Sequence, residues 1–246
     1  MLINNLSATL LLSVLGTGFC EASVSFVSQA EIGFSAVNLA NTVIVSGNFT
    51  PADSSINWVS ALDNDANPLD TSQYEVIANN PAVNLNLGTP HAFLVSGFAA
   101  SGNVDTYHVG YYQFDFTNTL DASETLDINL SYDFLASTSG SFVNNSFKLD
   151  FWKPGSEPGQ TISLGYAELS AGELFAISFS DALTFSDDLK TMNYQLDLSA
   201  NATRTIHADL TITNNLAPVP LPASIWFFMS GLIGFFGFKK RFKVVI

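Results

Sequence analysis

The stretch ETLDINLSYDF, Glu124–Phe134, alternates apolar and polar side chains with a period of two. Successive side chains of a β-strand point to opposite faces, so its apolar members would share one face. The acidic and amide members would share the other face, which should lie in water. The stretch therefore predicts a half-buried strand of an antiparallel sheet. Its apolar face comprises Leu126, Ile128, Leu130, Tyr132 and Phe134.

The same alternation recurs along the chain. It is clear in Tyr107–Thr117, Ser146–Trp152, Asn193–Leu198 and Thr203–Thr213. Weaker strand candidates are Val24–Val27, Thr42–Phe49, Ile56–Ala61, Tyr74–Ala78, Val83–Leu87, His91–Gly97, Thr161–Leu169 and Glu173–Ser180. Turn-forming clusters separate them, and no stretch of ten residues there has a helical period. About a dozen short strands predict a mainly β chain with one antiparallel β-sandwich, jelly-roll-like, over residues 23–215. A boundary near Gly97–Asn103 is the alternative to a single domain.

The chain is strongly acidic, with 22 Asp and Glu against 8 Lys and Arg. Removing Glu21 and the four basic residues after position 238 leaves a body with a net charge of about −17. Such a body is repelled by nucleic acids and by anionic polysaccharides, so no nucleic-acid partner is expected. Divalent cations, neutral glycans and basic surfaces are the partners that the charge allows, and solubility alone would also explain it.

The first residues, Met1–Ala22, have the features of a secretory signal peptide. Leu10–Gly16 supplies an apolar centre, and small residues precede a cut after Ala22. The Sec translocon and a signal peptidase are the partners that this segment predicts. The one cysteine, Cys20, lies before the cut, so the mature body would fold without disulfides and depend on its core.

The last thirty residues have three parts. A proline-rich stretch, residues 216–222, precedes the uncharged run Ala223–Phe238, and a basic tail, residues 239–246, follows. A helix of 16 residues is roughly 24 Å long, and flanking residues with snorkelling lysines would extend it towards a bilayer core. Half of the chain's basic residues follow the run, so we expect a transmembrane helix with a cytoplasmic tail and the body on the opposite side.

This tail resembles the PEP-CTERM sorting signal of Gram-negative bacteria. The resemblance lies in a V-P-L-P-A box, an S-G-L-x-G core within the apolar run, and a basic cluster, and the tail departs from the family's name at Leu221, where Glu is expected. The matching residues are Val219, Pro220, Leu221, Pro222, Ala223, Gly231, Gly234, Lys239, Lys240 and Arg241. The resemblance implies recognition by an exosortase, a membrane-embedded cysteine transpeptidase. It also implies an inner-membrane precursor with a periplasmic body, followed by release or transfer to the cell exterior, often in strains that make exopolysaccharide.

The body contains no catalytic sequence motif that we recognise, and we expect it not to be an enzyme. The loop DNDANPLD places oxygens at alternate positions, which suits a hard cation such as Ca²⁺. An Asx-rich turn that caps its own backbone is the alternative. The calcium candidates are Asp63, Asp65, Asn67 and Asp70. A zinc site would need the distant residues His91, His108 and His207 to converge.

Trp152 is the best candidate for carbohydrate binding. It follows the inward-facing Phe151 and should therefore point outward, just before a Pro/Gly loop. A tryptophan that covers an edge of the core is the ordinary alternative. The sequence thus predicts an exported cell-surface or extracellular-matrix protein, with a non-enzymatic binding or structural role, and no cofactor other than a possible Ca²⁺. The alternatives are a carbohydrate-binding module of a neutral exopolysaccharide matrix and a secreted hydrolase.

Overall fold

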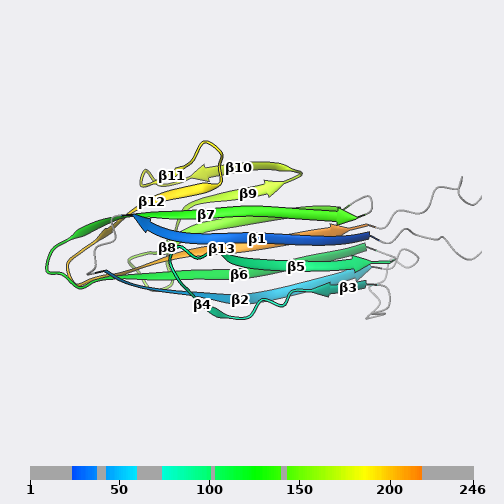
Figure 1. Cartoon of the computed structure of the whole chain (residues 1–246), viewed down its shortest axis with the longest axis horizontal. Helices are drawn as coiled ribbons and strands as arrows, with labels where there is room; N and C mark the ends of the chain where they lie inside the picture. Colours follow the sequence, from blue (N-terminus) through cyan, green and yellow to red (C-terminus); the bar gives the residue numbers. More distant parts are fainter. Residues whose placement is uncertain (1–23, 38–42, 60–73, 101–102, 140–142, 218–246) are drawn as a thin grey trace, which may run out of the picture.

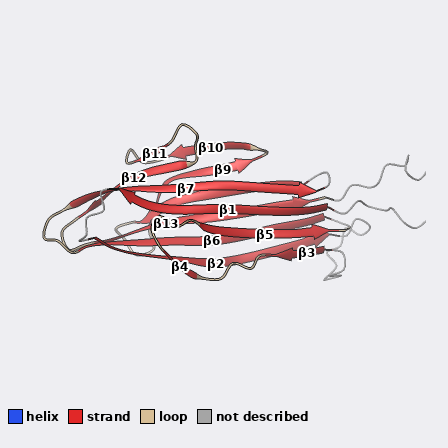
Figure 2. Cartoon of the chain, viewed as in Figure 1, coloured by secondary structure: helices blue, strands red, loops and turns tan. Residues whose placement is uncertain are grey.

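The computed structural model describes residues 24–37, 43–59, 74–100, 103–139 and 143–217. These ranges hold thirteen β-strands and no helix (Figure 2). A helix with the length and apolarity needed to cross a membrane is accordingly not found among the described residues. The prediction of a mainly β chain is confirmed for this part of the sequence.

The strands form two sheets in which all neighbours are antiparallel (Figure 1). The first sheet has the order β11 (Leu183–Phe185), β12 (Thr191–Leu198), β7 (Glu124–Ser139), β1 (Val24–Val37), β5 (His91–Ala99), β3 (Tyr74–Ile77). The second sheet has the order β10 (Glu173–Ser178), β9 (Thr161–Ser170), β8 (Val143–Pro154), β13 (Thr203–Leu216), β6 (Asn103–Asn118), β2 (Val43–Val59), β4 (Val83–Leu85).

The predicted apolar faces form the inner faces of the sheets. In β7, Leu126, Ile128, Leu130 and Tyr132 are buried, while the polar residues between them are half-buried or exposed. The inward residues of β8, β12 and β13 follow the same rule. Period-two alternation therefore identified the core side of the clear strands correctly.

Aromatic side chains join the inner faces. Phe34 of β1 and Phe114 of β6 have ring centroids 4.2 Å apart, and Phe134 of β7 stacks on Phe147 of β8 at 5.1 Å. Each contact links the first sheet to the second, which gives a sandwich-like arrangement. Gly47 permits this packing locally, because a Cβ there would lie 2.4 Å from the Phe114 ring.

A layer of polar side chains interrupts the core near one end. Ser28 of β1 donates to Asn214 Oδ1 at 2.5 Å, and the Asn214 amide donates to Thr106 Oγ1 at 2.9 Å. The backbone register places Asn145 beside Asn214, and His108 follows Thr106 on the inner face of β6. We call these five residues, Ser28, Thr106, His108, Asn145 and Asn214, the polar layer. Val24 and Leu216, at the two ends of the described chain, also lie at this end of the sandwich (Figure 1).

Short strands protect both lateral margins of the sandwich. On one side the chain runs from β3, the edge of the first sheet, to β4, the edge of the second. On the other side it runs from β10, the edge of the second sheet, to β11, the edge of the first. These four strands have only three to six residues each. Short edges offer little unpaired backbone to another chain.

Element boundaries differ from the predicted ones in several places. The largest difference is in β1, which was predicted to end at Val27 and extends to Val37. The two strands predicted within residues 42–61 are one strand, β2, with a register irregularity between Pro51 and Ser54. A proline has no N–H for the ladder, and a bulge absorbs this defect. β11 was not predicted at all, because three residues are too few to show an alternation.

Candidate functional site

Trp152 lies on the outer face of the second sheet, as the alternation predicted. It is half-buried, and its indole stacks on the imidazole of His207 from the neighbouring strand, with centroids 3.9 Å apart and an interplanar angle of 7°. The backbone register sets this contact, since Trp152 and His207 are direct partners in the β8–β13 ladder. Trp152 therefore does not cover an edge of the core; it is part of a fixed aromatic pair near the middle of an outer face.

Asp209 is the most perturbed carboxyl beside this pair. Burial raises the pKa of Asp209, a hydrogen bond from the Trp152 indole lowers it, and the charge of Asp150 raises it. Asp209 Oδ1 is buried without a hydrogen-bond partner in the described chain. Asp150 lies directly opposite Asp209 and forms an ion pair with Lys148 at 2.8 Å. The arrangement is a carboxyl held between an aromatic pair and a paired carboxylate.

Burial also affects His207, where it favours the neutral imidazole. Burial lowers its pKa, and the nearby carboxylate of Asp115 partly opposes this effect. Asp115 in turn accepts hydrogen bonds from Thr205 at 2.6 Å and from Gln113 at 3.1 Å. This part of the face can accept and donate hydrogen bonds next to an aromatic surface, which suits binding of a polar, uncharged molecule better than binding of an anion.

A shallow hollow of about 270 Å³ opens on the same outer face, directly over the polar layer. Its walls come from β2, β6, β13 and β8. Tyr107 lies within it with 43% of its surface exposed, and Asp105 accepts a hydrogen bond from the Asn215 amide. Sequence reasoning placed Tyr107 in a strand but did not single it out, because the hollow depends on how four strands align.

A second hollow, of about 460 Å³, lies on the outer face of the first sheet. Asp127 and Asn129 of β7, Asn193 and Gln195 of β12, and the turn residue Asp181 line it. Tyr194, the aromatic residue among its lining residues, is only 4% exposed, so the hollow lacks an open aromatic surface.

The three histidines lie apart and do not form the zinc site considered above. His91 bonds the Tyr112 hydroxyl at 3.1 Å, whereas His108 is inside the core and His207 is on the outer face. Burial lowers the pKa of each of them. Within the described residues, no group of three or more His, Cys, Asp or Glu side chains is placed to hold a metal ion.

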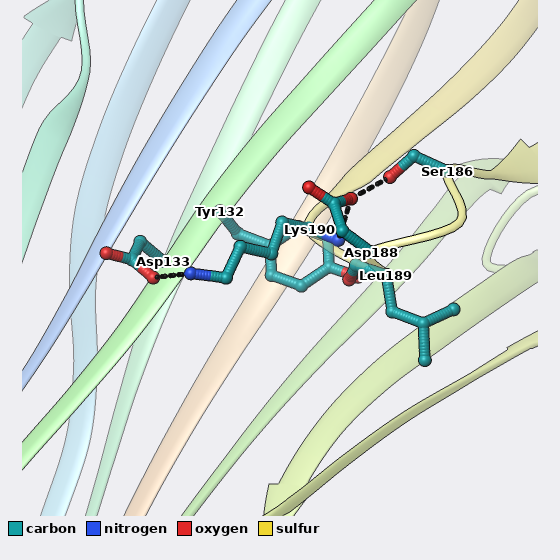
Figure 3. Close-up of polar contacts among 6 residues, drawn as sticks. All are labelled: Tyr132, Asp133, Ser186, Asp188, Leu189 and Lys190. Carbon is teal, nitrogen blue, oxygen red and sulfur yellow. Dashed lines mark hydrogen bonds and ion pairs between the residues drawn. The ribbon is translucent and has the colours of Figure 1, made fainter.

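The turn between β11 and β12 is fastened to β7, as Figure 3 shows. Asp188 Oδ1 accepts from Ser186 Oγ at 2.5 Å and from the Lys190 amide at 3.1 Å, which lowers the pKa of Asp188. Lys190 Nζ reaches Asp133 at 2.9 Å, and Tyr132 donates its hydroxyl to the Leu189 carbonyl. Burial, with the charge of Asp188, raises the pKa of Tyr132. The oxygens of Asp188 therefore serve the turn itself.

The other predicted site residues lie outside the described residues. These are the calcium candidates Asp63, Asp65, Asn67 and Asp70, the signal peptide Met1–Ala22, and residues 218–246 of the proline-rich stretch and tail. Leu216, the first residue of the predicted proline-rich stretch, is the buried last residue of β13. Their roles stay predictions. No family model matches the sequence, and a search of curated proteins finds no significant relative.

Proposed function

We propose that this protein is exported and acts outside the cell as a non-enzymatic binding or structural protein, sorted by a PEP-CTERM/exosortase system. The tail sequence, with its Val219–Ala223 box, apolar run and basic cluster, supports the sorting route. In this proposal a precursor is held in the inner membrane by residues 223–238, with its body in the periplasm. Processing near Pro222 then delivers the body to the cell surface or the extracellular matrix.

The body's architecture supports binding rather than turnover. Its outer faces carry amides, hydroxyls and carboxylates around two open hollows, and the aromatic pair Trp152–His207 lies between strands that fix it rigidly. Open and preorganised surfaces of this kind suit extended extracellular ligands, whose many weak contacts add up along a face.

Within the sandwich class, we propose a jelly-roll-like architecture. It is supported by the way β5, β6, β7 and β8 alternate between the two sheets. Calcium bound by the loop from Asp63 to Asp70 is a further part of the proposal, supported by its alternating oxygen ligands.

Intact mass and cell fractionation of the protein from its own host test the sorting proposal. The expected product is an extracellular or surface-bound chain that lacks Met1–Ala22 and the tail beyond about Pro222. A control with Pro220 and Pro222 both changed to Ala should insert in the membrane but remain unprocessed. A wild-type chain that still ends at Ile246 in the inner membrane would contradict processing.

The second candidate function is carbohydrate binding through Trp152. The observation that favours it is the stacked pair with His207, beside the hydrogen-bonding groups of Asp115 and Gln113. Replacing Trp152 by Ala should then remove retention on a glycan without unfolding the body.

A further inference from the structure

The hollow over the polar layer is lined by two rows of polar side chains that lie in register across four strands. The first row consists of three amides and one carboxylate, in the order Asn57, Asp105, Asn215, Asn144. The strands that carry the row lie about 4.8 Å apart. The register therefore spaces these groups evenly over about 14 Å.

The second row lies on the same face, two residues further along each strand and about 6.8 Å from the first. It has the order Ser55, Tyr107, Thr213, Ser146, so one aromatic ring lies among three hydroxyls. The hydroxyls of Ser146 and Thr213 are 2.5 Å apart and fix one side of the row. Tyr107 is 43% exposed and presents its ring to the solvent within the hollow.

We infer that this hollow binds one unit of a neutral saccharide, with Tyr107 as the stacking surface and the amide row as the hydrogen-bonding groups. A pyranose ring has an apolar C–H face, which packs on an aromatic ring, and a rim of hydroxyls that both donate and accept. Amides offer both donors and acceptors, and a carboxylate accepts only. A row of amides around one carboxylate therefore matches a rim of hydroxyl groups.

The charges of the residues that line the hollow favour a neutral ligand over an anionic one. Asp105 is the single carboxylate among the lining residues, and no lysine or arginine is among them. The body's net charge of about −17 adds a general repulsion of anions. One carboxylate is also too few for the oxygen cage that a calcium ion prefers.

The polar layer lies beneath the hollow and links the strands that form its floor. Thr106 and Asn214, which lie between the residues of the two rows in β6 and β13, point inward and are hydrogen-bonded to each other at 2.9 Å. Because a slip of one residue would turn the rows inward, this buried bond fixes the register on which the site depends.

This inference rests on the proposed function only in that an exported protein would meet such a ligand. It names a place different from Trp152, whose ladder partner is His207, six residues before Thr213 on the same face of β13. Tyr111 provides a matched control, since it follows Tyr107 by four residues on the same face of β6, is 44% exposed, and does not line the hollow.

The test is calorimetric titration of the full-length chain, purified in a detergent without a sugar headgroup, with cellohexaose, xylohexaose and maltohexaose. Oligogalacturonate serves as the anionic probe. We expect weak binding of at least one neutral oligosaccharide, with a Kd of about 0.1–1 mM. Tyr107→Ala should weaken it by about tenfold or more, whereas Tyr111→Ala should leave it within about twofold. Trp152→Ala is measured alongside them, because the aromatic pair is the competing site for the same kind of ligand. Circular dichroism shows whether each variant is folded.

Three results would overturn the inference. They are no binding of any of the three neutral probes at millimolar concentration, equal losses in the Tyr107 and Tyr111 variants, and a loss in the Trp152 variant alone. The last result would assign binding to the aromatic pair instead. None of them bears on the mass and fractionation experiment, so failure here and failure of the export proposal can be told apart.

Discussion

The two halves of the sandwich interior differ in chemistry, although buried aromatic rings such as Phe26 and Phe147 also flank the polar layer. Near one end the inner faces meet through aromatic rings, with Phe34 and Phe114 at 4.2 Å and Phe49 and Phe93 at 5.7 Å. Near the other end the polar layer joins Ser28, Asn214 and Thr106 by hydrogen bonds across the core. The aromatic half buries large apolar surfaces, and the polar layer buries groups that must find partners.

This difference separates the residues that stabilise the fold from the residues that fix how its strands align. Burial of aromatic rings contributes strongly to stability but tolerates small shifts of one sheet over the other. Buried hydrogen bonds contribute little net free energy, yet a shift that breaks them is costly. The hollow around Tyr107 lies over the polar layer, where alignment of the strands is most restricted.

The largest expected effect comes from removing a ring in the aromatic half. Phe114→Ala should lower the free energy of unfolding by about 3–5 kcal/mol, because the ring is 1% exposed and packs on Phe34 across the sheets. Chemical denaturation measures it. Phe175→Ala, at a 39% exposed position, is the control and should cost less than about 1 kcal/mol. A cost below about 2 kcal/mol for Phe114→Ala would show that this half can collapse around the gap.

An intermediate effect is expected from the polar layer. Asn214→Ala leaves Ser28 and Thr106 buried without their partner and should cost about 1–3 kcal/mol. Replacing the three together, Ser28→Ala, Thr106→Val and Asn214→Leu, should restore much of this stability. If the layer specifies register, the triple variant should nevertheless show broader amide resonances for β6 and β13 than wild type does. Equally sharp spectra would contradict a role in specification.

The sequence could predict which face of a strand a residue occupies, but not which residues of other strands lie beside it. Period-two alternation placed Tyr112, Phe114 and Phe116 inside, and it placed Trp152 outside, because each strand reports its own two faces. It does not report which strands are neighbours. The stacking of Trp152 on His207 depends on the β8–β13 register, and so the pair could not be predicted.

The hollow around Tyr107 was beyond sequence reasoning for the same reason. Its rows combine residues near positions 55, 105, 145 and 215, which four separate strands bring together. The polar layer gave a weak signal, since His108 lies within a predicted strand and Thr106 and Asn214 lie immediately beside predicted strands, at positions that continue the inward-facing alternation. A polar residue at such a position indicates either a buried network or a strand end, and only the pairing decides between them.

The smallest effect on stability at neutral pH is expected from the titration of His108. It is also the effect most specific to the polar layer. His108 is 2% exposed, neither ring nitrogen has a hydrogen-bond partner among the described residues, and burial lowers its pKa. Its ladder neighbours, Ile212 and Ser54, carry no charge that could stabilise an imidazolium. The ring is therefore neutral in the folded protein near pH 7, where its titration affects stability little.

Lowering the pH should reveal the contribution of His108 to stability. The unfolded chain binds a proton at His108 near pH 6.5, whereas the folded chain resists it to lower pH. Stability from this group is thus complete above about pH 6.5 and is lost as pH falls towards the folded pKa, by about 1.4 kcal/mol for each unit of separation. His108→Leu, similar in volume, should lose less stability between pH 7 and pH 5 than wild type does. Burial also lowers the pKa of His207, but the charge of Asp115 opposes this effect. His207→Leu should therefore flatten the dependence of stability on pH less than His108→Leu does. Parallel profiles for wild type and His108→Leu would mean that the imidazole gains a partner when it is protonated, and that the polar layer is less rigid than its hydrogen bonds indicate.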